Sequence, residues 1–430
     1  MEMIDAFEGL AFRPANILLA QDCDLALWSV VACDQYTSQP EYWQRVEERV
    51  GCAPSTLRLI LPECRLERPD IVTEITAINN RMTRYQREGR FLQLPDAMIY
   101  VERTLDCGKV RRGLVGMVDL ERYDYEPGAK AQVRATEGTV LARIPPRVEV
   151  RKNASIELPH VMLLTDDPMR TVIEPLAQQT ETMQPLYDFD LMERGGHISG
   201  WKLNAGQCTA VADALQTLAQ PEAFSGHYQA EHEPVLLFAV GDGNHSLATA
   251  KECYERQKRV IPEEQWEDLP ARYALCELVN LHDASLEFEP IHRVVFGAEP
   301  EKLLRQLQET CPGAFSGEGE GHVLRFAYGQ NRGAVTVPHP QGQLPVGTLQ
   351  SFLDQWLLQN TDARIDYIHG EDVACQLAQQ DHVTAFLLPA MEKEALFPTV
   401  VFDGALPRKT FSMGEAHDKR FYLEARKIRN

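Results

Sequence analysis

The sequence predicts a mixed α/β fold built from mixed sheets with flanking helices. Short apolar runs with β-branched members alternate with longer segments whose apolar residues recur at helical spacing. The run 235–240 is typical of a strand buried on both faces, and the helix expected after it carries Leu247, Ala250 and Tyr254 on one side. A length of 430 residues allows two or three subdomains. We expect an N-terminal α/β region at 1–160, a central region at 161–300 and a smaller C-terminal α/β region at 301–430.

The N-terminal region is expected to combine helices with a hairpin. Pro40 is tolerated in the first turn of a helix, and Ile71, Ile75 and Ile78 begin an apolar stripe typical of a core-facing helix. Two alternating segments flank Asp106-Cys107-Gly108 and predict a hairpin. The expected elements are strands at 28–32 and 57–61, helices at 40–50 and 71–88, and hairpin strands at 97–104 and 109–120.

The rest of the chain repeats this alternation. An apolar strand at 273–281 follows the central helix, so we expect it to lie beside the strand at 235–240. The other expected elements are strands at 157–165, 385–388 and 399–402, helices at 168–186, 210–218, 301–309 and 349–357, and a hairpin at 322–328 and 333–337.

The junction between the central strand and its helix is the main candidate site. A glycine-flanked loop that leads into a helix directs backbone N–H groups and the positive end of the helix dipole at one point, where phosphate or carboxylate binds well. The same residue types are also ordinary helix caps and turn formers, so a purely structural role is the alternative. The residues concerned are Gly241, Asp242, Gly243, Asn244, His245, Ser246 and Thr249.

A second group of candidates surrounds an arginine-rich stretch. Guanidinium groups bind phosphate or carboxylate through two parallel hydrogen bonds, whereas exposed ion pairs are the structural alternative. Glu137 lies among them and is expected to act either as a base or as a cap. The predicted ligands in this stretch are Arg134, Thr139, Arg143 and Arg147.

Two aspartates follow the strand expected at 157–165. Asp166 and Asp167 are candidates for holding Mg²⁺, although Asp-Asp-Pro is equally typical of a helix start. Asp34 follows another expected strand, at the end where α/β ligands gather. His292 and Arg293 come shortly after the strand at 273–281 and are candidate phosphate or substrate ligands, and we expect Arg293 to approach the Asp242 loop.

Three further residues are weaker candidates. His197 follows a glycine pair, and a lone histidine is more often structural than catalytic. Arg408 and Lys409 form a basic turn that would suit an anion or simply face solvent.

Composition excludes several classes of function. The formal net charge of −20 opposes nucleic-acid binding, and no apolar stretch is long enough for a membrane-spanning helix. The first ten residues contain no Lys or Arg, unlike a signal peptide, and the ten cysteines form no C-x-x-C pair, which favours reduced thiols and a cytoplasmic location. G-x-G-x-x-G, Walker and G-x-S-x-G motifs are absent. Nothing in the sequence indicates the oligomeric state.

Several segments together resemble one protein family. These are V-A-C-D-Q-Y-T-S-Q-P (31–40), S-T-L-R-L-I-L-P-E (55–63), R-A-T-E-G-T-V (134–140), E-P-I-H-R-V (289–294) and L-P-R-K-T-F (406–411). With D-G-N-H-S at 242–246, they resemble the uncharacterised family called domain of unknown function 1015, whose members often carry D-G-H-H-R there. The box is also similar to that of the ParB/sulfiredoxin-like superfamily, which includes free-serine kinases.

This resemblance implies a sulfiredoxin-like core and a nucleotide phosphate at the start of the central helix. We therefore expect an enzyme, a phosphotransferase acting on serine, phosphoserine or a similar small polar metabolite, with ATP or ADP and Mg²⁺ as cofactors. Asp242, His245 and Glu137 are the expected catalytic residues. The alternatives are a metal-dependent hydrolase of a small phosphate ester and a regulator that binds a nucleotide or metabolite without turnover. Ser246 stands where many relatives have arginine, which makes nucleotide use the open question.

Overall fold

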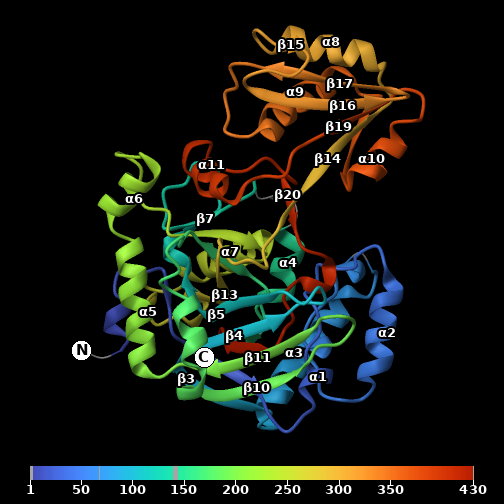
Figure 1. The fold of residues 1–430 in the computed structure, drawn as a ribbon. Coiled ribbons are helices and arrows are strands. Elements are labelled where there is room, and N and C mark those ends of the chain that lie inside the picture. Colours follow the sequence, from blue (N-terminus) through green and yellow to red (C-terminus); the bar gives the residue numbers. More distant parts are fainter. Residues whose placement is uncertain (1–2, 67, 139–143, 430) are drawn as a thin grey trace. The chain divides into compact units, whose positions relative to one another are not determined.

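The chain has the predicted mixed α/β fold, and it divides into two compact units (Figure 1). The computed structural model describes residues 3–66, 68–138 and 144–429. The first unit comprises residues 1–286 and 415–430, and the second comprises 287–414. The structure thus divides the chain elsewhere than at 160 and 300, because strands from both sides of residue 160 share one sheet.

The first unit is organised around a ten-stranded mixed sheet. In spatial order its strands are β10 (Gln184–Asp190), β11 (His197–Lys202), β4 (Ile99–Thr104), β5 (Val110–Asp119), β13 (Tyr273–Asn280), β9 (Met162–Thr165), β12 (Phe238–Asp242), β7 (Val133–Ala135) and β6 (Tyr123–Asp124), with β1 (Phe12–Arg13) paired to β5. The predicted hairpin is confirmed as β4 and β5. The expected pairing of β12 with β13 is wrong, because β9 lies between them, antiparallel to β12 and parallel to β13.

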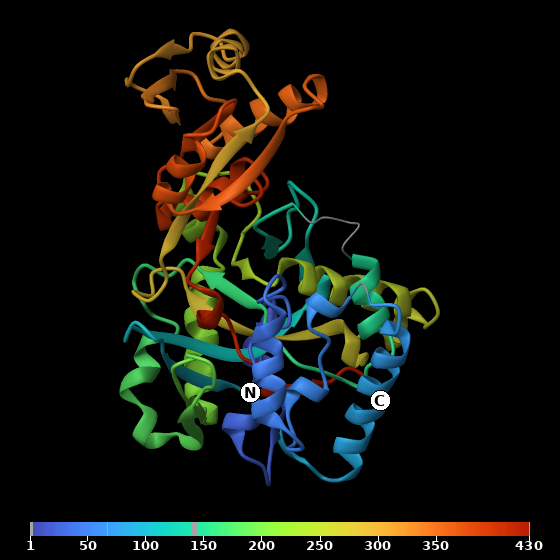
Figure 2. The same cartoon turned by 90° about the vertical axis from the view of Figure 1, so that its right-hand side faces the viewer.

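A second sheet of this unit contains the C-terminal strand. Its order is β3 (Phe91–Ala97), β2 (Ala15–Ala20), β21 (Glu424–Lys427) and β8 (Ile156–Glu157). Figure 2 shows the red C-terminal segment running among the blue elements formed by the start of the chain. Buried ion pairs hold the segment there: Arg420 contacts Glu277 at 2.8 Å, and Arg426 contacts Glu157 at 2.7 Å.

Helices complete the first unit. They are α1 (Leu25–Trp28), α2 (Pro40–Val50), α3 (Ile71–Arg87), α4 (Ile144–Arg151), α5 (Ala205–Leu218), α6 (Pro221–Tyr228) and α7 (Asn244–Lys258). Four predicted elements of this unit are wrong, and one of them is the strand expected at 157–165, which the structure divides between β8 of the second sheet and β9 of the first. The strand expected at 28–32 is absent, because α1 ends at Trp28 and the following residues form only an isolated bridge between Val31 and Phe421. The strand at 57–61 is replaced by a 3₁₀ turn, and the helix at 168–186 by short 3₁₀ turns and the start of β10.

The second unit contains a seven-stranded sheet. Its order is β15 (Phe315–Ser316), β17 (Asn331–Val337), β16 (His322–Tyr328), β19 (Val383–Leu387), β14 (Phe288–Phe296) and β18 (Arg364–His369), with β20 (Phe411–Met413) paired to β14. Its helices are α8 (Pro300–Thr310), α9 (Pro345–Gln359), α10 (Glu371–Leu377) and α11 (Leu396–Phe402). The strand expected at 399–402 is therefore wrong, since those residues continue α11. Every described helix of the chain is too short or too polar to cross a lipid bilayer.

Candidate functional site

Two glycines shape the turn between β12 and α7. A Cβ on Gly241 would lie 2.7 Å from the Leu164 side chain, so glycine lets β12 pack closely on β9. Gly243 has φ +82°, and a Cβ there would lie 3.1 Å from the Val161 Cα. Its carbonyl accepts the Ser246 and Leu247 N–H groups at 3.0 and 2.9 Å, which starts the helix. The turn therefore places the positive end of a 15-residue helix close to the residues that precede β9.

A chain of hydrogen bonds connects this helix start to the C-terminal segment. The Ser246 Oγ lies 2.8 Å from the Nε2 of His160, and the Nδ1 of His160 lies 2.9 Å from the Tyr422 hydroxyl. That hydroxyl accepts the Cys33 N–H at 3.1 Å. His160 and Tyr422 are buried, whereas Ser246 is half-buried. A serine that contacts a histidine held by a third group is the arrangement found around activated hydroxyl nucleophiles.

The same residues line a cavity of about 160 Å³ within the first unit. Most of its wall is aliphatic, and the polar groups are few, as in typical small-molecule sites. The polar or charged lining side chains are Cys33, Glu63, Arg147, Arg151, Glu157, His160, Ser246, Thr249 and Tyr422. The structure therefore brings together three residues that the sequence predicted, namely Arg147, Ser246 and Thr249.

Both cavity-lining arginines, Arg147 and Arg151, lie on helix α4. Val148 of α4 packs with Ala248 and Cys253 of α7. Arg147 and Arg151 are four residues apart on one helix face. Arg147 forms an ion pair with Glu63, and Arg151 pairs with Glu157. The charges of these four groups balance.

Glu157 is the most heavily engaged of the four. Burial opposes its ionisation, but the guanidinium groups of Arg426 and Arg151 outweigh this effect and leave its pKa below the ordinary value. One of its oxygens also accepts the Leu275 N–H at 2.8 Å. Glu157 is therefore an anchor for Arg151 rather than a proton acceptor at neutral pH.

The other residues of the predicted loop have different surroundings. The described lining of the cavity does not include Asp242, Asn244 or His245. Asp242 accepts its neighbour's N–H at 2.9 Å and lies 3.4 Å from the Lys419 ammonium group. Asn244 accepts the Thr136 N–H at 3.2 Å, which ties the end of β7 to the start of α7. His245 is half-buried in the first turn of the helix.

The remaining candidates of the arginine-rich stretch are dispersed. Arg134 is 2% exposed and donates to the backbone carbonyls of Ala131 and Pro234 at 2.9 and 2.7 Å, which is a structural role. Glu137 is half-buried. Thr139 and Arg143 lie outside the described residues.

The two aspartates after β9 do not share a metal-binding arrangement. Asp167 accepts the Thr171 and Val172 N–H groups at 2.6 and 2.9 Å, so it caps a turn. Asp166 contacts the Nε2 of His282 at 2.6 Å and also the Tyr228 hydroxyl. Because the two carboxylates have separate sets of partners, they do not fit a shared Mg²⁺ ion.

In the second unit, the predicted ligands serve its own packing. His292 is buried, which lowers its pKa, and its Nδ1 accepts the Leu388 N–H at 3.1 Å. Arg293 is fully buried and donates to the carbonyls of Lys409 and Arg408 at 2.9 and 2.7 Å. The Arg408 and Lys409 side chains are exposed. Because the guanidinium of Arg293 bonds within the second unit, its expected approach to the Asp242 loop gains no support.

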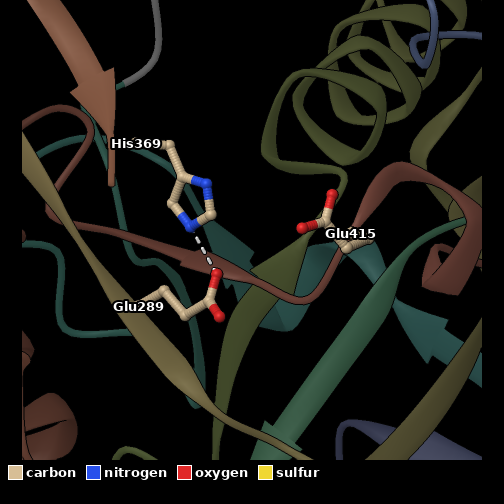
Figure 3. A group of neighbouring side chains, drawn as sticks. All are labelled: Glu289, His369 and Glu415. Carbon is tan, nitrogen blue, oxygen red and sulfur yellow. Dashed lines mark hydrogen bonds and ion pairs between the residues drawn. The ribbon is translucent and has the colours of Figure 1, made fainter. Parts of the chain in front are cut away.

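Other polar pairs of the chain are more exposed. Figure 3 shows His369 hydrogen-bonded to Glu289, between strands β18 and β14 of the second unit. In the first unit, His197 bonds Asp190 at 2.8 Å and also Asp188 on the β10–β11 hairpin. Asp34 accepts the Gln35 side-chain amide at 3.0 Å, next to the cavity-lining Cys33.

Sequence reasoning missed most of the polar cavity lining, namely Cys33, Glu63, Arg151, Glu157, His160 and Tyr422, and it missed Lys419 beside Asp242. His160 and Tyr422 are 262 positions apart, and Lys419 comes from the same C-terminal segment as Tyr422. The one available signal was the position of His160 just before a strand that neighbours β12. That signal is weak, because the neighbour relation itself was not predicted.

Comparison with known proteins identifies a matching family and several similar solved structures. The family described as "Protein of unknown function (DUF1015)" matches residues 7–369. No curated protein matches the chain. Among solved structures, a variant of free serine kinase in complex with AMP has 11% identity and a TM-score of 0.39, covering 74% of this chain and 93% of that one. A conserved hypothetical protein from Pyrococcus furiosus has 12% identity and a TM-score of 0.35 over 73% and 94% of the two chains. A truncated SbnI from Staphylococcus aureus has 8% identity and a TM-score of 0.37 over 70% and 82%.

Proposed function

Since the chain belongs to the DUF1015 family, whose description assigns no activity, we propose an activity from its own residues: a small-molecule phosphotransferase that binds phosphate at the loop from Gly241 to Ser246. The proposed acceptor or donor metabolite is serine, phosphoserine or a similar small polar compound. The proposed second substrate is a nucleotide such as ATP or ADP.

The observation that carries this proposal is the cavity shared by the start of α7 and two arginines. Phosphoryl transfer depends mainly on positioning and on neutralising the charge of the moving group. Ser246 and Thr249 supply hydroxyl groups, the helix start supplies a positive dipole end, and Arg147 supplies a guanidinium that can exchange its carboxylate for a phosphate.

The size of the cavity supports a small metabolite. A volume of about 160 Å³ is close to the roughly 150 Å³ of an engineered cavity that holds benzene. A serine-sized compound fits such a space, whereas the rest of a nucleotide would extend beyond it. In this proposal His160 is the imidazole within the cavity, and catalytic roles for Asp242, His245 and Glu137 remain predictions.

Ligand-induced thermal stabilisation tests the proposal. The full chain would be screened with ATP, ADP, CTP and phosphoserine, each with and without Mg²⁺. A ligand at 100 times its Kd stabilises the folded state by about 2.7 kcal/mol. We expect stabilisation by a nucleotide, followed by transfer between nucleotide and serine or phosphoserine, detected by phosphorus NMR.

Other outcomes of these experiments would select a different function. Turnover of phosphoserine without nucleotide selects the hydrolase, and tight binding without turnover selects the regulator. Absence of stabilisation by all four ligands overturns phosphate binding. Measurement of nucleotide stabilisation in Asp242→Ala tests whether the Asp242 side of the loop takes part in binding. Asp242 contacts Lys419 rather than the described cavity.

A further inference from the structure

We propose that Ser246 is a covalent nucleophile, that His160 accepts its proton, and that Tyr422 positions His160. The inference rests on the proposed function only in taking a phosphoryl group as the electrophile. No local sequence pattern predicts this arrangement, because Ser246, His160 and Tyr422 come from three distant parts of the chain. These are the start of α7, the segment before β9 and the C-terminal segment.

The proposed role of His160 requires its ring proton on Nδ1, and the hydrogen-bond network accommodates that tautomer. The Tyr422 hydroxyl accepts the Cys33 N–H at 3.1 Å and also hydrogen-bonds with the Cys33 thiol. If its own proton points to that sulfur, its remaining lone pair accepts from the Nδ1–H of His160 at 2.9 Å. The Nε2 is then an acceptor, and the Ser246 hydroxyl donates to it over 2.8 Å. This is the tautomer that a general base requires.

The surroundings hold the imidazole in place. His160 is 7% exposed and Tyr422 is 2% exposed. Arg420 donates to the carbonyl of Pro159 at 3.0 Å, which fixes the backbone beside the ring. Gly243 permits the close approach, because a Cβ there would lie 3.5 Å from the His160 ring and 3.1 Å from the Val161 backbone.

Ser246 also faces the right charges. It lies in the first turn of α7, where the helix dipole favours developing negative charge. It shares the cavity with Arg147, whose guanidinium can exchange the Glu63 carboxylate for phosphoryl oxygens.

The step conserves atoms and charge. The Ser246 Oγ attacks the phosphorus of a nucleoside triphosphate or small phosphate ester, and the Oγ–P bond forms as the bond to the leaving oxygen breaks. The hydroxyl proton passes to the Nε2 of His160. The Nε2–H then gives this proton to the leaving oxygen. A second hydroxyl, from the acceptor metabolite or water, next attacks the phosphorus on phosphorylated Ser246 and passes its own proton to the neutral Nε2, which returns it to the departing Ser246 Oγ. Ser246 is regenerated.

Labelling with a fluorophosphonate tests the nucleophile without any assumed substrate. The oxygen of an activated serine displaces fluoride from the phosphorus of the probe and stays bonded to it. Mass spectrometry then identifies the modified residue. We expect Ser246 to be labelled and Ser246→Ala not to be. His160→Gln should slow labelling at least 100-fold, since a positioned base typically contributes 10²–10⁴-fold. Ser199, which bonds Asp188 on an exposed hairpin, is the matched serine and should stay unlabelled.

Nitrogen NMR of the His160 ring tests the positioning role of Tyr422. We expect a protonated Nδ1 and an unprotonated Nε2 in the folded protein, and loss of this preference in Tyr422→Phe while the thermal midpoint shows that the variant is folded. A ring protonated on Nε2, or labelling of Ser199 at the rate of Ser246, overturns the inference. Labelling of Ser246 without nucleotide binding would keep the nucleophile and reject the phosphotransferase. Nucleotide binding without labelling of Ser246 would keep the phosphotransferase and reject Ser246 as the nucleophile.

Discussion

Arginine plays opposite roles in two regions of this molecule. In the first unit, Arg147 lines a cavity and pairs with Glu63, a carboxylate that a phosphate can replace. In the second unit, Arg293 is fully buried, and its guanidinium donates to three backbone carbonyls and to Gln350. Both were predicted to bind phosphate. The difference teaches that the kind of partner separates a binding arginine from a structural one.

Removing Arg293 should have the largest effect on stability. In Arg293→Met the carbonyls of Ile291, Arg408 and Lys409 lose a buried donor, and we expect the second unit to lose about 3–5 kcal/mol. Hydrogen exchange of the β14 amides would measure it. Arg408→Met removes an exposed guanidinium and should cost at most about 1 kcal/mol. Equal costs for the two variants would contradict the comparison.

Removing Arg147 should affect ligand binding more than folding. A charge-assisted hydrogen bond contributes about 1.5–3 kcal/mol, so Arg147→Ala should weaken phosphate-ligand affinity roughly 10- to 150-fold by calorimetry. Arg58→Ala is the control, because Arg58 also pairs with a glutamate, Glu47, outside the described cavity lining. Identical affinities of both variants would place the phosphate elsewhere.

The turn before α7 offers a smaller test. Gly243→Ala forces a side chain into φ +82° and against Val161, so we expect a loss of about 1–2 kcal/mol and slower labelling of Ser246. Chemical denaturation measures the first and the fluorophosphonate the second. Gly89→Ala, at φ +68° with open space around it, is the matched variant and should affect stability alone.

The smallest effect is expected at His197. Hydrogen bonding to Asp190 raises its pKa above 6.5 against a smaller opposing effect of burial. The folded state therefore binds this proton more tightly than the unfolded state. The stabilisation is fully present below about pH 6.5 and is lost as the pH rises through the raised value. NMR titration of wild type and Asp190→Asn would show it, and an unchanged His197 pKa in the variant would refute the assignment.

Much of the fold follows from local pattern. Helices α3 and α9 were predicted because their apolar stripes repeat at helical spacing, and α2 because Pro40 suits a helix start. Both hairpins were predicted because their strands alternate around turn residues. The strand expected at 57–61 failed because apolar runs this short do not distinguish strand from turn. There, Ser55 caps a 3₁₀ turn, and Thr56 bonds the Trp28 carbonyl at 2.8 Å.

Only some residues of the candidate site could be predicted from the sequence. Ser246 and Thr249 could be chosen because glycine, hydroxyl and helix start stand together in the sequence. His160 could not, since its role depends on β9 entering the sheet beside β12, an insertion that leaves no local pattern. Arg134 and Arg147 look alike in sequence, and only burial against carbonyls or placement on the cavity-facing side of α4 separates them.

The return of residues 415–430 to the first unit has a consequence for biosynthesis. The ribosome makes the first 286 residues, then the whole second unit, and only then the segment that carries Tyr422 and β21. At about 5–20 residues per second, the nascent first unit waits on the order of ten seconds for its last strand. During that time the edges of β2 and β8 that β21 will occupy stay open to chaperones. The Ser246–His160 pair lacks its tyrosine until synthesis passes residue 422, so we expect an unfinished chain to carry no activated serine.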